Sequence, residues 1–116
     1  MELSNQELDQ RLLDLGSEIH ATELALVSAA KEYELAKAGY ENSVDEAYLT
    51  KKATNSELTV KELEASARTE NYVLRLNMIE KEAIYKGLRS KVNQIETKIG
   101  IIQSIIKLRV SEMRTL

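Results

Sequence analysis

Residues 74–113, LRLNMIEKEAIYKGLRSKVNQIETKIGIIQSIIKLRVSEM, repeat apolar side chains at alternating spacings of three and four. One position of this heptad holds Met78, Tyr85, Val92, Ile99, Ile106 and Met113, and the other holds Leu74, Leu88, Ile95 and Ile102. The first half of the chain has the same spacing, with Leu8, Leu12, Leu15, Ile19, Leu26, Ala29, Tyr33, Ala36, Tyr40 and Ala47, and only Thr22 polar. Two such stripes are typical of a coiled coil, so the chain is predicted to be an interaction module.

The composition fits a single domain, residues 1–116, made almost wholly of helix. The chain has no proline, tryptophan or phenylalanine, only four glycines, and 4% aromatic residues. Two helices with so few large side chains form apolar stripes and cannot enclose a compact core. The predicted fold class is all-α: a long antiparallel helical hairpin (coiled coil) that forms homo-oligomers through its C-terminal helix. Cysteine is absent, so packing alone must hold this fold.

Capping signals place the helix boundaries. Ser4, followed three residues later by Glu7, is a capping box that starts the first helix, predicted over about residues 5–50. The polar segment KKATNSELT, residues 51–59, loses the heptad and is predicted as the turn. Thr59 and Glu62 form a second capping box, so the second helix is predicted over about residues 60–115.

An antiparallel fold-back at this turn sets a register for the hairpin. It places Leu49 near Val60 and Asn5 near Ile105, and leaves about ten C-terminal residues, from Ile106 to Leu116, without a partner in the same chain. An apolar tail of this kind favours self-association. The residues predicted to form the oligomer interface are Ile99, Ile102, Ile106, Leu108, Val110 and Met113. The alternative is a long helix that pairs only with another chain.

Charges beside the two stripes support the hairpin. Residues 1–60 have a net charge of −7 and residues 61–116 a net charge of +4. Acidic side chains flank the first stripe (Asp9, Glu18, Glu23, Glu32 and Glu46), and basic side chains flank the second (Arg68, Arg75, Arg89, Lys91 and Lys98). Like flanking positions face each other in an antiparallel pair, so Glu18 is predicted to pair with Lys91.

Signs of catalysis are missing from the sequence. His20 is the only histidine and has no helical metal-binding motif around it, and there is no glycine-rich phosphate loop. We therefore expect no enzyme activity, no cofactor and no metal site.

The first ten residues, MELSNQELDQ, do not resemble a signal peptide, and no apolar run is long enough to span a bilayer. The expected location is cytoplasmic, in the host cell if the protein is encoded by a phage, with no membrane partner.

Basic residues that the predicted hairpin leaves without an acidic partner are candidates for binding DNA phosphates. They are Lys51 and Lys52 at the turn, Lys86, Lys107 and Arg114 in one outward column, and Arg109 on the stripe itself. Each phosphate that such a group neutralises releases counterions, which favours binding. Tyr33, Tyr40 and Tyr85 occupy stripe positions, where packing in the core is the expected role.

Residues 58–109, LTVKELEASARTENYVLRLNMIEKEAIYKGLRSKVNQIETKIGIIQSIIKLR, resemble the small helical bacteriophage proteins grouped with the UvsY-type recombination mediator of T-even phages. The shared pattern is a long hairpin followed by a helix with a late glycine and an apolar run that closes on a basic residue, here Gly100 through Arg109. The similarity covers about residues 50–110. In that family a basic stretch contributes to DNA binding. The nearest equivalent in this chain, near the turn, is only Lys51 and Lys52.

The resemblance implies a non-enzymatic homo-oligomer that functions in DNA recombination. Such a protein binds single-stranded DNA and helps a strand-exchange recombinase displace single-strand-binding protein. The alternative is a structural or chaperone-like coiled-coil module, either prefoldin-like or a phage assembly factor, that does not bind nucleic acid. Salt-sensitive binding to an oligonucleotide distinguishes the two.

Overall fold

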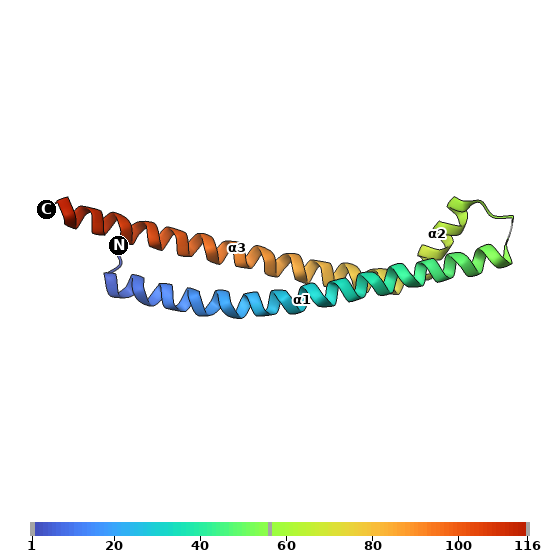
Figure 1. Cartoon of the computed structure of the whole chain (residues 1–116), viewed down its shortest axis with the longest axis horizontal. Helices are drawn as coiled ribbons and strands as arrows, with labels where there is room; N and C mark the ends of the chain where they lie inside the picture. The colour runs from blue at the N-terminus through green and yellow to red at the C-terminus, as the bar shows by residue number, and fades with distance from the viewer. Residues whose placement is uncertain (1, 56, 116) are drawn as a thin grey trace. The chain divides into compact units, whose positions relative to one another are not determined.

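The computed structural model describes residues 2–55 and 57–115. Helices account for 93% of this part of the chain, and it contains no strand. The helices are α1 (Asn5–Thr54), α2 (Val60–Glu70) and α3 (Tyr72–Thr115). They follow one another along the chain in the order shown in Figure 1. The prediction of an all-α helical hairpin is therefore confirmed.

Both predicted capping boxes start a helix. The backbone N–H of Glu7 donates to Ser4 Oγ at 3.1 Å, and the Ser4 N–H donates to Glu7 Oε2 at 3.2 Å. At the second start, the N–H of Glu62 donates to Thr59 Oγ1 at 3.2 Å. Each bond satisfies a backbone donor that has no partner within the first turn of a helix.

The chain forms two compact units. The first unit joins the N-terminal part of α1, up to Val27, to α3 from Lys86 onwards. Its buried apolar side chains are Leu8, Val92, Ile95 and Ile102, all from the two predicted stripes. The polar stripe residue Thr22 is also buried, and its hydroxyl donates to the Glu18 carbonyl at 2.8 Å. Thr22 is tolerated in the seam because this bond satisfies its hydroxyl.

The second unit comprises Ser28–Tyr85. Ala29, Leu63 and Ala67 are its buried apolar residues. The rings of Tyr33 and Tyr85 stack, with centroids 6.0 Å apart and an interplanar angle of 18°. This contact confirms the predicted packing role of these two tyrosines. An offset aromatic pair of this kind adds about 0.5–1.5 kcal/mol beyond the area that it buries.

The predicted boundaries near the turn are wrong in two places. Helix α1 continues to Thr54, one turn beyond the predicted end, so Lys51 and Lys52 lie in the last helical turn. The predicted second helix is interrupted at Asn71, which separates α2 from α3. The Asn71 side-chain amide donates to the carbonyl of Ala67 at 2.9 Å and to that of Ser43 at 3.3 Å. Asparagine is well suited to this position because its side chain competes for backbone hydrogen bonds.

At the open end of the hairpin, Ile105 lines one cavity with Leu3 and Leu8, the residues on either side of Asn5. Arg109 also reaches this end: Arg109 Nη1 donates to Asn5 Oδ1 at 2.7 Å. Arg109 Nη2 donates to the Leu3 carbonyl at 2.7 Å. The chain before α1 therefore contacts part of the predicted tail, so the tail without a partner is shorter than predicted. Leu116, at the end of the predicted tail, lies outside the described residues.

The predicted pair of Glu18 and Lys91 forms, with Lys91 Nζ 4.0 Å from Glu18 Oε1. Glu32 pairs instead with Lys81, whose Nζ lies 3.4 Å from Glu32 Oε2. We expect Glu18→Lys to destabilise the fold modestly, because it places two cations side by side. Adding Lys91→Glu should restore part of the loss, with a coupling of about 0.2–1 kcal/mol because both side chains are half-exposed.

Thermal unfolding of the parent, both single variants and the double variant at low salt measures this coupling. Since the interaction is electrostatic, the coupling should shrink as salt is added. Strictly additive effects at low salt would contradict the pairing.

Candidate functional site

Three of the six candidate DNA-binding cations are engaged within the chain, contrary to prediction. Lys51 Nζ lies 3.1 Å from Glu70 Oε2, so this lysine links the end of α1 to the end of α2. Arg109 is half-buried and donates one hydrogen bond to Asn5, the first residue of α1, and one to the Leu3 carbonyl before it. Lys86 also has an interaction within the chain. The expectation of no partner fails for Lys51 because it lies beside Glu70 of α2, and for Arg109 because the residues at the start of α1 lie alongside α3.

The other three candidates, Lys52, Lys107 and Arg114, are exposed. None of them forms an ion pair with a residue that the structure describes. Lys107 and Arg114 are one heptad apart on α3 in the first unit, so they project from the same side of that helix. Lys52 belongs to the second unit. Of these three candidates, two therefore lie in the first unit and one lies in the second.

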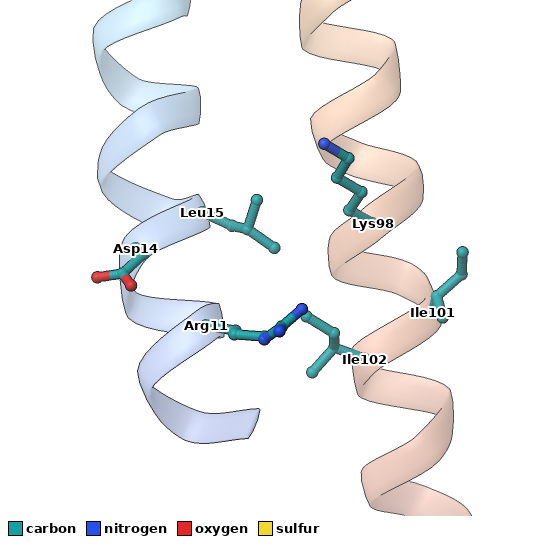
Figure 2. Close-up of a pocket in the computed structure, with 6 residues that line it drawn as sticks. All are labelled: Arg11, Asp14, Leu15, Lys98, Ile101 and Ile102. Carbon is teal, nitrogen blue, oxygen red and sulfur yellow. The ribbon is translucent and has the colours of Figure 1, made fainter. Parts of the chain in front are cut away.

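A groove between α1 and α3 in the first unit contains two further cations. It is lined by Arg11, Asp14, Leu15, Lys98, Ile101 and Ile102. In Figure 2 the Arg11 side chain reaches towards α3 and the Lys98 side chain reaches into the space between the helices, while the Asp14 carboxylate points away. Gln10 Nε2 donates to Asp14 Oδ1 at 2.9 Å, so this carboxylate already has a partner on its own helix.

Sequence reasoning missed this groove. Lys98 was predicted to pair with an acid of the first helix, but it forms no ion pair with any described residue. Arg11 was not predicted as a site residue because it is the single basic residue among the first 27, which also hold six acidic residues. The sequence signal was the helical register: Arg11 and Leu15 share one side of α1, and Lys98 and Ile102 share one side of α3.

Half of the predicted oligomer interface belongs to the hairpin seam. Ile102 is buried, and Ile99 and Ile106 are half-buried, so these side chains already pack within the chain. Ile106 lines a shallow cavity together with Leu12 of α1. Leu108, Val110 and Met113 are exposed, and they remain available to another molecule.

Additional apolar residues are exposed along α3. Ile101, Ile105 and Leu108 line a shallow hollow there with the small residues Gly100 and Ser104. Ile101 is 57% exposed and Leu108 62% exposed. Position 100 has open space where a Cβ would lie. Exposed apolar side chains gathered on one helix mark a surface at which proteins associate.

Two features are absent from the described residues: a cluster of metal-ligating side chains and a membrane-spanning helix. No group of three or more histidine, cysteine, aspartate or glutamate side chains in this part of the chain is arranged to hold a metal ion. None of the described helices has a segment both apolar enough and long enough to cross a bilayer.

Comparison with protein-family models, curated proteins and solved structures gave no match to this chain. The function must therefore be inferred from the residues themselves.

Proposed function

We propose that the protein is a non-enzymatic recombination mediator, a self-associating helical hairpin that binds single-stranded DNA. In this role it acts in the cytoplasm and helps a recombinase to displace single-strand-binding protein. The resemblance of residues 58–109 to phage mediators first suggested this function. The basic residues of α3 support it independently.

The observation that carries the proposal is an excess of basic residues on α3. Residues 86–115 contain seven basic and two acidic side chains. Lys98, Lys107 and Arg114 are exposed, and none forms an ion pair with a described residue. Intramolecular pairing therefore leaves positive charge available on this helix. Phosphate contacts made by such groups supply most of the affinity in sequence-independent DNA binding.

We expect the purified protein to bind a fluorescent single-stranded oligonucleotide with an affinity that falls steeply as salt rises and depends little on sequence. Replacing Lys107 and Arg114 together by glutamine should flatten the plot of log affinity against log salt by about 1.4, because each phosphate contact to a single strand contributes about 0.7. Fluorescence anisotropy measures both quantities.

A charge-matched control for this variant is the replacement of Lys31 and Lys61 by glutamine. Both lysines are exposed residues of the second unit, without an ion pair to a described residue. We expect the control to bind nearly as the parent does. If the parent protein fails to bind single-stranded DNA even at low salt, the mediator proposal is wrong.

A second candidate function is a coiled-coil assembly or chaperone-like module without nucleic-acid binding. The exposed apolar side chains of α3 favour it, because a module of this kind works through protein contacts alone. Self-association is common to both functions, so the mass of the protein in solution does not separate them. Salt-sensitive oligonucleotide binding does separate them, since a pure protein adaptor should show none.

A further inference from the structure

The groove between α1 and α3 brings together two cations that are far apart in the sequence. Arg11 and Lys98 stand at its sides, and Leu15 and Ile102 contribute an apolar floor (Figure 2). Both cations are exposed, and neither forms an ion pair with a described residue. We propose that this groove binds the backbone of single-stranded DNA, with Arg11 and Lys98 contacting phosphates. The inference rests on the proposed function and assigns it a site.

Electrostatics favours an anion in this groove. Arg11 and Lys98 bring two positive charges to one groove without an ion pair to a described residue, and like charges repel each other. An anion between them relieves this repulsion. Asp14, the acidic residue at the rim, does not supply that anion, because its carboxylate accepts from Gln10 and points away from the groove (Figure 2).

The side-chain chemistry suits a phosphodiester backbone. The Arg11 guanidinium offers a planar fork that can bind two phosphate oxygens at once, and Lys98 offers a compact point charge on a flexible stem. The stems of both residues cover apolar surface while their charged ends remain at the surface. A single strand also exposes apolar base faces that a duplex keeps stacked, and the floor formed by Leu15 and Ile102 can receive them.

The test compares two double variants of the full chain by anisotropy with a labelled oligothymidylate. Replacing Arg11 and Lys98 by glutamine should lower the affinity at about 50 mM salt by roughly 10- to 100-fold and flatten the salt slope by about 1.4. The Lys31 and Lys61 double variant carries the same net charge, two units more negative than the −3 of the parent. We expect it to bind nearly as the parent does.

A charge-conserving variant tests whether the loss of DNA affinity comes from the lost charges or from a disturbed fold. Exchanging the two cations, as Arg11→Lys with Lys98→Arg, keeps both charges in the groove and should retain most of the parent affinity. Circular dichroism should show equal helicity for all variants, because both side chains are exposed. If the exchanged variant loses as much affinity as the glutamine variant while remaining folded, phosphate contact at this groove is not the explanation.

The remaining outcomes are distinct. If the parent binds DNA and the groove variant loses no more affinity than the charge-matched control, the groove assignment is wrong while the proposed function stands. If the parent does not bind DNA at all, both fail. A polyglutamate peptide serves as a further probe, since an acidic protein segment could use the same cations. Loss of peptide binding with unchanged DNA binding in the glutamine variant would overturn the assignment in favour of a protein partner.

Discussion

The largest loss of stability is expected from a charge placed in the seam of the first unit. Ile95 is 2% exposed and packs with the other apolar stripe residues of α1 and α3. Replacing Ile95 by aspartate should unfold this unit, because an unpaired carboxylate buried among apolar groups costs several kcal/mol. Small domains have only about 5–15 kcal/mol of stability in total. Replacing Ile95 by alanine should cost about 2–5 kcal/mol.

Thermal unfolding followed by circular dichroism measures both effects. The matched control is Ile84→Asp, the same substitution on the same helix at a position that is 46% exposed. It should lower the unfolding temperature much less, because the carboxylate remains hydrated. An Ile95→Asp variant with the helicity and unfolding temperature of the parent would show that α1 and α3 do not pack through this stripe in solution.

The second large effect is expected on self-association. Leu108 and Met113 are 62% and 70% exposed on α3, although both are large apolar residues. Replacing both by aspartate should break an oligomer that buries them, since each charge must then be desolvated without a partner. The species measured by sedimentation should shift towards the monomer mass of 13.1 kDa.

Leu13 and Leu24 provide the matched control for this substitution. They lie on α1 in the same unit and are 68% and 62% exposed. If α3 carries the interface, their replacement by aspartate should leave the mass of the assembly unchanged. An equal loss of mass in both variants would show that α1 takes part as well. Unchanged mass in the Leu108 and Met113 variant would remove the C-terminal part of α3 from the interface.

Arg109 illustrates why the role of a cation is hard to read from a helical sequence. The helical repeat placed it on the stripe itself, and that position is compatible with both DNA contact and contact within the chain. Its hydrogen bonds go to Asn5 and to the Leu3 carbonyl, a partner that any residue type provides. Backbone carbonyls carry no sequence signal, so only the three-dimensional structure identifies this role.

Local patterns in the sequence were sufficient for the fold class, the helix starts and the seam. The heptads predicted the buried Leu8, Ile95 and Ile102, and the capping boxes predicted the starts of α1 and α2. These features depend on neighbours three or four residues away, and a helix preserves such spacings whatever surrounds it. The pair of Glu18 and Lys91 followed from the same repeat.

Features that depend on contacts between segments far apart in the sequence could be identified only from the tertiary structure. At the interruption, the Asn71 side chain donates a hydrogen bond to the carbonyl of Ser43, 28 residues earlier. A single asparagine within a helical pattern does not predict such an interruption. The bonds of Arg109 to Asn5 and to the Leu3 carbonyl removed this cation from the set that is available for DNA. The groove formed by Arg11 and Lys98 arises only when α1 and α3 pair. A heptad repeats every seven residues, so it defines which face is buried but leaves the register between helices open to shifts of about one turn.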